Sequence, residues 1–464
     1  MSINVMDSLL DAYKTVQADK RIGIFGNPIR HTLSPVIHDT LSNALGIDER
    51  YLVFQVEKNL GEHVQSAFEH GILGLNITVP YKQDVMEFLE EIDTAALDIG
   101  AVNTLVRTEH GYKGYNTDMP GLARALSSED IALKGKKVIM LGAGGAARAV
   151  AYMCMQYGAE ITYIVNRTYE NAEKIAADMN AIFNCRGIMP VAAADYTSIP
   201  QGKYLFIQCS SVGLHEGDGL PVVTDETFYS MAECGVDLIY NPAETPFLKL
   251  MKKLGVKAVN GLKMLLYQGV MAYELWNGIK VSEELCNQVY FRLHEAVYGR
   301  KIVLIGYMGA GKTTLGRYIA QKYAYDFLDT DAYISEKTGM SINEIFRVYG
   351  EEHFRNLETE MLSELMTKNG NMVIATGGGL PLRPENRDLL HKLGKVYYLR
   401  ANAETIYNRV KDSTDRPLLA CDNPYDKICD MLKKRTPIYE AAADVCLDTD
   451  GLTAEEAVKQ IMEA

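Results

Sequence analysis

Short apolar runs and longer amphipathic stretches alternate along most of the chain. The runs 138–141 and 302–305 contain only apolar residues, which is typical of strands covered on both faces. Between 261 and 298 apolar residues recur at helical spacing instead, for example at Val289, Leu293 and Val297. Strands that alternate with helices form parallel sheets covered by helices, so we predict an α/β protein. Further strands are predicted at 21–26, 74–80, 161–165, 205–208, 236–240 and 372–375.

The composition is that of an ordinary globular protein, with 464 residues, 47% hydrophobic and 23% charged. A net charge of -13 argues against a nucleic-acid partner, because phosphate binding needs a basic face. The most apolar stretch, 138–155, contains Arg148 and three glycines, so no membrane span is expected, and the N-terminus lacks the apolar core of a signal peptide. The eight cysteines are scattered, as in reduced cytosolic proteins. We expect a cytoplasmic protein.

A first glycine-rich loop, Gly142-Ala143-Gly144-Gly145-Ala146, separates the strand 138–141 from an amphipathic segment. Glycine permits a tight turn and a close approach of the backbone to a pyrophosphate, which would lie at the N-terminus of the following helix. The alternative is a glycine turn that only packs a helix on a sheet. The loop favours a dinucleotide-binding domain of the Rossmann type.

The end of the next strand indicates which dinucleotide is bound. It reads Asn166-Arg167-Thr168, where NAD sites usually carry Asp or Glu for the ribose hydroxyl. A carboxylate would repel a 2′-phosphate, whereas the Arg167 guanidinium could pair with one through two hydrogen bonds. NADP is therefore the predicted cofactor.

A second loop, 306–313, reads G-x-x-G-x-G-K-T and lies between the strand 302–305 and a predicted helix 314–323. In such a P-loop the backbone amides surround the phosphates, Lys312 reaches the β- and γ-phosphates, and the Thr313 hydroxyl coordinates Mg²⁺. The loop predicts ATP-dependent phosphoryl transfer but does not identify the acceptor. Its predicted ATP-binding residues are Gly309, Ala310, Gly311, Lys312, Thr313 and Thr314.

Over about its first 297 residues the chain resembles shikimate dehydrogenase. The matching motifs occur in the family's order and are His31-Thr32-Leu33-Ser34-Pro35, 76–82 (NITVPYK), 100–104 (GAVNT), 116–118 (NTD), 237–242 (DLIYNP) and 261–268 (GLKMLLYQ). The resemblance implies a two-lobed α/β substrate domain with a Rossmann NADP domain. It also implies reduction of 3-dehydroshikimate to shikimate with NADPH.

Reducing a ketone needs a hydride from the nicotinamide and a proton for the developing alkoxide. The resemblance implies that Lys82 donates this proton or stabilises the charge, and that Asp118 orients Lys82 and holds substrate hydroxyls. Neutral hydroxyls and amides suit a ring with one carboxylate and three hydroxyls. The residues expected to bind the ring are Thr32, Ser34, Thr78, Lys82, Asn103, Asp118, Tyr240 and Gln268.

The chain departs from the dehydrogenase family at three places. Thr32 stands where the family often has Ser, so a quinate/shikimate dehydrogenase is an alternative. Where the family usually has an Asn-Ala-Thr segment near the nicotinamide, this chain has Cys209-Ser210-Ser211. Asn171 stands where a second arginine is common, so the preference for NADP is expected to be weaker. The predicted NADP-binding residues are Gly142, Gly144, Gly145, Ala146, Asn166, Arg167, Thr168, Ser211 and Gly261.

Residues 301–464 resemble shikimate kinase. The motifs are 327–331 (FLDTD), 350–358 (GEEHFRNLE), 376–379 (TGGG), 415–419 (DRPLL) and 435–439 (RTPIY). The resemblance implies a P-loop domain like those of nucleoside-monophosphate kinases, with a parallel sheet and a lid. It also implies phosphorylation of shikimate to shikimate 3-phosphate by MgATP.

Two carboxylates at alternate positions of a strand end share one face, and their duties can differ. By resemblance, Asp329 would hold Mg²⁺ together with Thr313, and Asp331 would position or deprotonate the attacking hydroxyl. The alternatives are a pair that binds only magnesium and a plain solvated turn. Arg416 lies in the polar stretch 411–426, the expected lid, and would contact ATP and stabilise the transferred phosphoryl. The predicted catalytic residues of this half are Lys312, Asp331 and Arg416.

Forked arginine donors can bind the carboxylate of the acceptor. By resemblance, Arg355 and Arg435 take this role, and Glu358 orients Arg355. Structural ion pairing is the alternative for any one of these arginines. The residues expected to bind shikimate in this half are Asp331, Arg355, Gly377, Gly378, Gly379 and Arg435.

Together these observations predict a bifunctional enzyme of the shikimate pathway, with 3-dehydroshikimate and shikimate as its small-molecule partners. The predicted domains are residues 1–118 for the substrate lobe, completed by helices in 260–297, then 119–259 for the Rossmann domain, a linker at 298–300, and 301–464 for the kinase. A regulatory protein on degenerate enzyme folds would be expected to have lost Lys82, Asp118, Lys312, Asp329 or Asp331, and all five are present.

Overall fold

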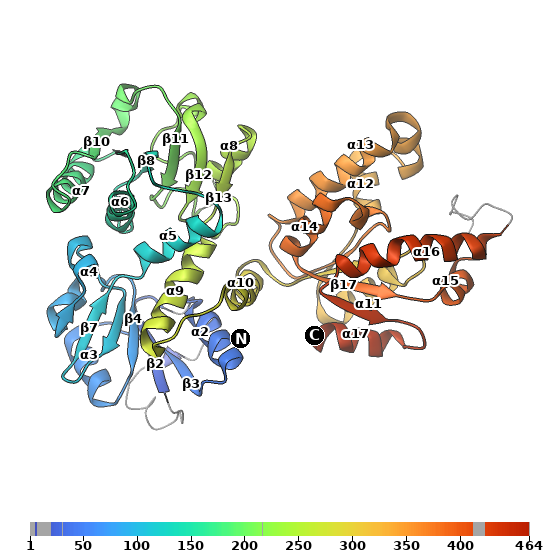
Figure 1. The fold of residues 1–464 in the computed structure, drawn as a ribbon, viewed down its shortest axis with the longest axis horizontal. Helices are drawn as coiled ribbons and strands as arrows, with labels where there is room; N and C mark the ends of the chain where they lie inside the picture. The colour runs from blue at the N-terminus through green and yellow to red at the C-terminus, as the bar shows by residue number, and fades with distance from the viewer. Residues whose placement is uncertain (1–4, 7–19, 30, 216, 412–422, 464) are drawn as a thin grey trace. The chain divides into compact units, whose positions relative to one another are not determined.

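The computed structural model describes residues 5–6, 20–29, 31–215, 217–411 and 423–463. It consists of two compact units, residues 1–293 (unit 1) and 294–464 (unit 2). Figure 1 shows both units, coloured along the chain, and each is described by itself. Within the described ranges, no helix is long and apolar enough to cross a membrane.

The first lobe of unit 1 is a mixed β-sheet with helices packed on it (Figure 1). Its elements are β1 (Val5–Met6), β2 (Lys20–Gly26), α2 (Ser34–Leu45), β3 (Glu49–Gln55), α3 (Leu60–Glu69), β4 (Gly74–Ile77), the 3-10 helix η1 (Asp84–Phe88), β5 (Glu91–Ile92), α4 (Thr94–Ile99), β6 (Thr104–Arg107) and β7 (Tyr112–Tyr115). The strand order is β1-β3-β2-β4-β6-β7-β5. β1 to β4 pair in parallel, whereas β6 runs antiparallel to both of its neighbours. Ile22, Ile24 and Phe25 of β2 are buried, because this strand lies inside the sheet.

The second lobe of unit 1 is a parallel sheet of the Rossmann type, which confirms the predicted fold class. Its elements are β8 (Lys137–Leu141), α6 (Ala147–Gln156), β9 (Ile161–Asn166), α7 (Tyr169–Ile182), β10 (Ile188–Ala192), η2 (Ala193–Ser198), β11 (Tyr204–Gln208), η3 (Glu226–Met231), β12 (Ala232–Asp237), α8 (Pro246–Lys253) and β13 (Lys257–Val259). The strand order is β10-β9-β8-β11-β12-β13. From β8 the chain proceeds to β9 on one side and later returns to β11 on the other. The loop after β8 therefore lies where the strand order reverses, and α/β sheets bind ligands at such points.

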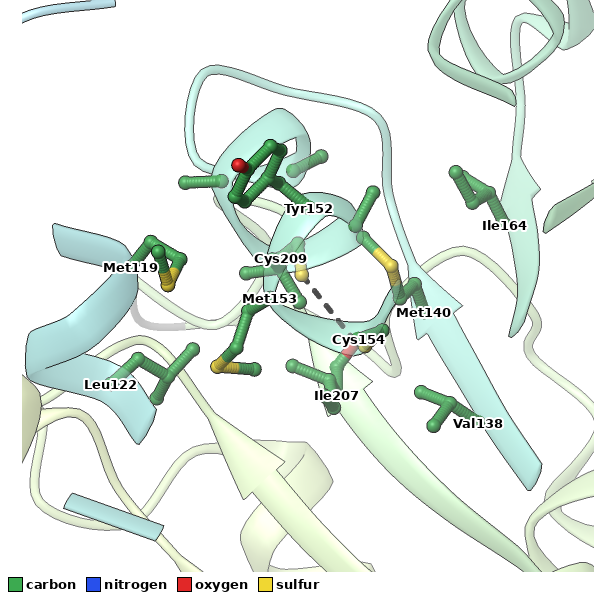
Figure 2. Packing of buried hydrophobic residues seen from close by; sticks show 14 of the residues in the cluster. Met119, Leu122, Val138, Met140, Tyr152, Met153, Cys154, Ile164, Ile207 and Cys209 are labelled. Atoms are coloured by element: carbon green, nitrogen blue, oxygen red, sulfur yellow. Dashed lines mark hydrogen bonds between the residues drawn. The ribbon is translucent and has the colours of Figure 1, made fainter. Parts of the chain in front are cut away.

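Two helices connect the lobes of unit 1, α5 (Asp118–Ser128) and α9 (Leu262–Asn277). Helix α10 (Glu283–Tyr298) follows them and extends past the unit boundary at residue 293. Figure 2 shows Met119 of α5 in one buried cluster with Met153 of α6 and Ile207 of β11. The start of α5, where Asp118 lies, is therefore anchored in the core of the Rossmann lobe.

Helix α9 returns the chain to the first lobe. The indole nitrogen of Trp276 donates a hydrogen bond to the Leu105 carbonyl of β6 at 2.8 Å. Gly74 of β4 makes room for this indole, since a Cβ at Gly74 would lie 2.0 Å from its nitrogen. Ala272 and Trp276 share a buried cluster with Ile22 of β2. The residues of α9 thus reach the substrate side of the unit.

Unit 2 is built on a parallel sheet in the order β15-β16-β14-β17-β18. Its elements are β14 (Lys301–Ile305), α11 (Lys312–Tyr323), β15 (Asp326–Asp329), α12 (Thr330–Thr338), α13 (Ile342–Leu365), β16 (Met372–Ala375), η4 (Leu380–Leu382), α14 (Pro384–Leu393), β17 (Lys395–Arg400), α15 (Ala403–Val410), α16 (Pro424–Ala441), β18 (Val445–Asp448) and α17 (Ala454–Glu463). The apolar run 302–305 is the buried central strand, and the P-loop follows it directly. This arrangement agrees with the predicted P-loop fold class.

One predicted strand is too long, one is displaced along the chain, and one predicted placement is wrong. β4 ends at Ile77, so 78–80 lie in the loop after it. β12 spans Ala232–Asp237 and not 236–240, so 238–240 lie in the loop after it. Asp331 does not share a strand face with Asp329, because β15 ends at Asp329 and Asp331 lies in the first turn of α12. The Asp329 carboxylate accepts hydrogen bonds from the amides of Asp331 and Ala332, at 3.2 and 3.3 Å. This cap starts the helix and ends the strand.

Candidate active sites

A cavity of about 470 Å³ in unit 1 is lined by residues of both lobes. All eight residues predicted to bind the substrate ring lie around it. They are Thr32, Ser34, Thr78, Lys82, Asn103, Asp118, Tyr240 and Gln268. Sequence reasoning missed Leu238, Met264 and His31, which also line the cavity. All three lie inside the motifs 31–35, 237–242 and 261–268, and that position is the signal in the sequence that could have found them.

Lys82 and Asp118 form an ion pair within this cavity. The Lys82 Nζ lies 2.6 Å from Asp118 Oδ2, and the two side chains are 32% and 18% exposed. Lys82 follows β4, and its carbonyl accepts a hydrogen bond from the Val102 amide at 2.8 Å. Asp118 is the first residue of α5. The pair thus joins two elements and presents an ammonium group and a carboxylate to the same space.

The side chain of Asn103 has a fixed orientation. Its Oδ1 accepts hydrogen bonds from the Thr117 amide at 2.8 Å and from the Thr117 and Thr104 hydroxyls at 3.1 Å each. A backbone amide can only donate, so the oxygen must face Thr117. The amino group of Asn103 is therefore the part that can donate to a ligand in the cavity.

A second cavity of about 540 Å³ surrounds the first glycine loop. Eight of the nine predicted NADP residues line it. They are Gly142, Gly144, Gly145, Ala146, Asn166, Arg167, Thr168 and Ser211. Asn171, where a second arginine is common, lines it as well. Gly261, the ninth, lines the substrate cavity instead, and Leu238 lines both, so the two cavities adjoin at Leu238.

The glycine loop leaves its backbone open toward this second cavity. Gly142 has a φ of 106°, and a Cβ there would lie 2.9 Å from the Cβ of Ser210, so only glycine fits. A Cβ on Gly145 would meet no atom within 4 Å. Asn166 stabilises the loop, since its Oδ1 accepts from the Ala143 amide at 3.2 Å. The amides at the start of α6 thus fit the pyrophosphate of a dinucleotide.

Two buried polar residues that sequence reasoning missed hold the loops between the cavities. The Asp237 carboxylate accepts from the Ile239 amide at 3.0 Å and the Thr245 hydroxyl at 2.6 Å. Burial raises the pKa of Asp237 to about 6. Gln208 accepts from the Ser210 amide and donates to the carbonyls of Ser210 and Val212. Each is the last residue of a buried strand. A polar residue at such a position is a weak signal in the sequence that its side chain binds the backbone of the following loop.

In unit 2 a cavity of about 910 Å³ surrounds the P-loop. Ten predicted residues line it: Gly309, Ala310, Gly311, Lys312, Thr313, Thr314, Asp329, Asp331, Gly377 and Gly378. Lys312 Nζ donates to the carbonyls of Gly306 and Tyr307 at 2.8 and 2.9 Å. Arg409 of α15 also lines the cavity and was missed by sequence reasoning. The predicted residue Arg416 lies outside the described residues.

Thr313 and Asp329 present oxygen atoms of the kind that Mg²⁺ prefers. The Thr313 hydroxyl donates to Asp329 Oδ2 at 3.1 Å, while Asp329 Oδ1 caps α12. One carboxylate oxygen and one hydroxyl at the end of a P-loop fit a Mg²⁺ ion that takes its other ligands from water and phosphate. The two residues would hold the ion through these atoms.

The glycine run 377–379 lies against three predicted side chains. A Cβ on Gly377 would lie 2.4 Å from Asp331 Oδ1, and one on Gly379 would lie 2.6 Å from Arg355 Nη2. Arg435 Nη1 lies 3.5 Å from the Gly378 carbonyl. The sequence-distant residues Asp331, Arg355 and Arg435 are thereby brought to one place.

Two further residues hold the glycine run, and sequence reasoning missed both. The Tyr439 hydroxyl donates to the Gly378 carbonyl at 2.6 Å, and the Gly377 amide donates to the Thr330 hydroxyl at 2.8 Å. Tyr439 lies four residues after Arg435 on α16, so it lies on the same helix face. Its place at the end of the motif 435–439, together with that spacing, is the signal that could have found it.

Burial dominates the acid–base behaviour of this site. Burial, and then the charge of Asp329, raises the pKa of Asp331 above its usual range, while Lys312 and Arg355 oppose the rise. Burial raises the pKa of Glu358 to about 7 against the opposing guanidinium of Arg355. Arg355 donates to Glu358 at 2.8 Å and to Glu351 at 2.9 Å. Asp331 is therefore a weaker acid, and a stronger proton acceptor, than a solvent-exposed aspartate.

Family models match both parts of the chain. Residues 24–105 match the shikimate dehydrogenase substrate-binding domain, 123–188 shikimate/quinate 5-dehydrogenase, and 261–289 the shikimate 5'-dehydrogenase C-terminal domain. Residues 308–464 match shikimate kinase.

Similar proteins cover unit 1 almost completely. A shikimate dehydrogenase (NADP(+)) from Carboxydothermus hydrogenoformans is 40% identical over 261 residues, which is 56% of this chain and 92% of that protein. The crystal structure of a chorismate mutase/shikimate 5-dehydrogenase fusion protein from Clostridium acetobutylicum has a TM-score of 0.54 and 34% identity, and covers 61% of this chain and 99% of that one.

The shikimate 5-dehydrogenase of Thermus thermophilus, in complex with NADP(H) and shikimate, has a TM-score of 0.51 and 30% identity. It covers 59% of this chain and 99% of that one. The chain therefore belongs to the shikimate dehydrogenase family, and its C-terminal part is a shikimate kinase domain.

Proposed function

We propose that this chain catalyses two consecutive reactions. Unit 1 reduces 3-dehydroshikimate to shikimate with NADPH, and unit 2 phosphorylates shikimate to shikimate 3-phosphate with MgATP. One observation carries the proposal: each nucleotide loop adjoins polar side chains suited to the same carboxylated polyol, with the Lys82–Asp118 pair at 2.6 Å in the first site.

In unit 1, NADPH supplies the hydride when it is bound. Lys82 holds a proton at Nζ beside the substrate oxygen that becomes an alkoxide, and transfers it as the charge develops. Asp118 keeps Lys82 in place and accepts from a substrate hydroxyl. Asn103 donates its amino group to the ring, because its oxygen is occupied by Thr117. Thr32 and Ser34, whose hydroxyls lie 3.2 Å apart, would bind the carboxylate.

Arg167 selects the cofactor in this proposal. It lines the second cavity next to Asn166 and Thr168, at the end of β9 where the adenosine ribose lies in Rossmann domains. Its guanidinium would bind the 2′-phosphate, which supports NADP. The NADP(+) dehydrogenase relative and the NADP(H) complex support the same choice.

In unit 2, MgATP supplies the phosphoryl group when it is bound. Asp331 takes the proton of the attacking hydroxyl, for which its raised pKa is suited. Arg355 and Arg435 bind the carboxylate of shikimate and thereby orient the ring. Lys312 binds the β- and γ-phosphates, Thr313 and Asp329 hold Mg²⁺, and Arg416 is proposed to stabilise the transferred phosphoryl.

Two further assignments belong to this proposal. The domain boundaries are those predicted from the sequence, with the linker at 298–300. The scattered cysteines, of which those in the described residues are free thiols, favour the cytoplasm.

A coupled assay tests the proposal. The full chain is incubated with 3-dehydroshikimate, NADPH and MgATP, and shikimate 3-phosphate is detected by mass spectrometry. NADPH oxidation without MgATP and ADP formation from shikimate without NADPH isolate the two steps. Failure of either isolated step would refute that half. A higher rate with quinate and NAD⁺ than with shikimate and NADP⁺ would support the quinate/shikimate alternative instead.

A further inference from the structure

Two structural elements that serve different ligands meet inside unit 1. Helix α6 begins directly after the glycine loop 142–146, and helix α4 ends at Ile99, directly before the segment that carries Asn103. Figure 1 shows α4 of the first lobe lying below α6 of the second lobe. Ile99 belongs to the same buried cluster as Ala147 and Tyr152 of α6.

One side chain, Arg148, connects these elements by hydrogen bonds. It is the second residue of α6 and does not line either cavity of unit 1. Its Nε donates to the Ile99 carbonyl at 2.7 Å, and its Nη2 donates to the Asp98 carbonyl at 3.4 Å. Its Nη1 pairs with the Asp178 carboxylate of α7. The guanidinium thus joins the end of α4 to two helices of the Rossmann lobe.

The carbonyls that Arg148 binds are not used by the turn that ends α4. The Gly100 amide donates to Ala96 and Leu97, and the Ala101 amide donates to Ala96. The carbonyls of Asp98 and Ile99 therefore depend on a donor from outside the helix. An arginine placed between them supplies a rigid fork of donors.

The contact is reinforced one turn further along α6. The Tyr152 hydroxyl donates to the Asp98 carboxylate at 3.4 Å, and the ring is buried among the residues shown in Figure 2. The Arg148 side chain itself is 23% exposed. Movement of α6 relative to α4 would therefore break several charge-assisted contacts at once.

We propose that Arg148 is a positioning residue that couples cofactor binding to substrate binding in unit 1. Closure of the glycine loop on a dinucleotide fixes the start of α6, and Arg148 transmits this constraint through α4 to Gly100 and Asn103. Substrate held by Asn103 favours the same arrangement. The coupling is reciprocal by thermodynamic necessity. The inference rests on the proposed dehydrogenase function.

The test measures this coupling in the full chain. NADPH binding is followed by its fluorescence, with and without saturating shikimate, and without MgATP so that unit 2 is inactive. NADPH and shikimate are both reduced and form a dead-end complex. In the unsubstituted chain, shikimate should tighten NADPH binding by about fivefold or more. In Arg148→Met the ratio of the two dissociation constants should fall to about one, while NADPH alone still binds.

Matched variants separate coupling from general stability. Arg186→Met removes an exposed arginine of the same lobe and should leave the ratio unchanged. Arg148→Lys keeps the charge but replaces the planar fork of donors by a single ammonium group, and should retain part of the coupling. If Arg148→Met does not fold, Asp178→Asn and Arg148→Lys provide the test instead. Each weakens the contacts of residue 148 and should lower the ratio of the two NADPH dissociation constants.

Unchanged coupling in Arg148→Met would overturn the inference, and so would a ratio of one in the unsubstituted chain. Those results leave the proposed function intact as long as the chain still reduces 3-dehydroshikimate. If the chain neither binds NADPH nor reduces 3-dehydroshikimate, both the function and the inference fail.

Discussion

Glu358 combines burial with a charge, and this conflict gives unit 2 a predictable response to pH. The side chain is 1% exposed, and burial raises its pKa to about 7 although Arg355 stabilises the charged form. In the unfolded chain a glutamate has a pKa of about 4.3. Between these two values the folded state binds more protons at this site than the unfolded state does.

The consequence is a loss of stability as pH rises from about 4.5 to about 7. Glu358→Gln removes this titration while keeping a hydrogen-bond acceptor for Arg355. We compare the unfolding free energy of unit 2 in the unsubstituted chain with that in Glu358→Gln. As the pH rises across this range, the value of the unsubstituted chain should fall relative to that of the variant by up to roughly 3 kcal/mol. Denaturant unfolding at several pH values measures it, with the unit 2 transition identified by its stabilisation with MgATP. A difference that does not change with pH would contradict the prediction.

Arg167 supports a second prediction at the scale of a single residue. Arg167→Gln removes the proposed partner of the 2′-phosphate and should lower kcat/KM with NADP⁺ by about 10–100-fold, since a charge-assisted hydrogen bond is worth about 1.5–3 kcal/mol. The value with NAD⁺ should change little. Steady-state oxidation of shikimate with both cofactors measures this. Arg186→Gln is the control, and a preference for NAD⁺ in the unsubstituted chain would refute the role of Arg167.

At the scale of elements, the loop that follows β12 and the glycine that precedes α9 decide how the two cavities of unit 1 meet. Leu238 lines both cavities, and the Gly261 amide donates to the Ile239 carbonyl at 3.1 Å. The Cβ of any other residue at Gly261 would lie 2.1 Å from the Leu238 carbonyl oxygen. Gly261 was predicted to bind NADP, and a direct contact with the cofactor stays a prediction. The close packing of Gly261 against the Leu238 carbonyl also requires a glycine at this position.

Gly261→Ala should therefore displace Leu238 and impair unit 1. Overpacking of this kind costs about 1–3 kcal/mol, so the melting temperature of unit 1 and its reduction rate should both fall. Gly219→Ala is the control, because Gly219 is exposed and a Cβ there meets no atom within 4 Å. Thermal unfolding and NADPH oxidation measure the effect. Equal behaviour of the two variants would show that the loop adapts to the added methyl.

At the scale of the whole molecule, the chain carries two catalytic units whose proposed reactions follow one another. The product of the first site is the acceptor of the second. Nothing in either site as described requires a residue of the other unit: each nucleotide loop has its own cavity and its own polar lining. The two activities should therefore be separable by substitution.

Lys82→Met should lower the reduction rate by about 10²–10⁴-fold, the usual loss when a proton donor is removed, and leave phosphorylation unchanged. Asp331→Asn should do the reverse. Each variant serves as the folding control of the other, because the unaffected activity reports on the same chain. Loss of both activities from either single change would contradict the independence of the sites.

The sequence by itself determined the fold class, the two nucleotide loops and about half of the residues that line the three cavities. This was possible because the patterns that indicate them are local in the sequence. Examples are a glycine where the backbone must approach a phosphate, and a polar residue just after a buried strand. For the same reason Thr313 and Arg167 could be named from their neighbours in the chain, whereas Lys82 was named from the resemblance of its motif, 76–82, to the dehydrogenase family.

Only the tertiary structure decided how distant residues meet. Asp331 was placed on a strand face by its alternate spacing, but the cap made by Asp329 starts a helix there. The orientation of Asn103 depends on Thr117, 14 positions away, and the hydrogen bond of Asp237 depends on Thr245, 8 positions away. Arg148 binds carbonyls of α4 that lie 49 and 50 positions away. The pairing of a buried polar side chain is set by packing, which brings together segments whose local patterns carry no information about each other.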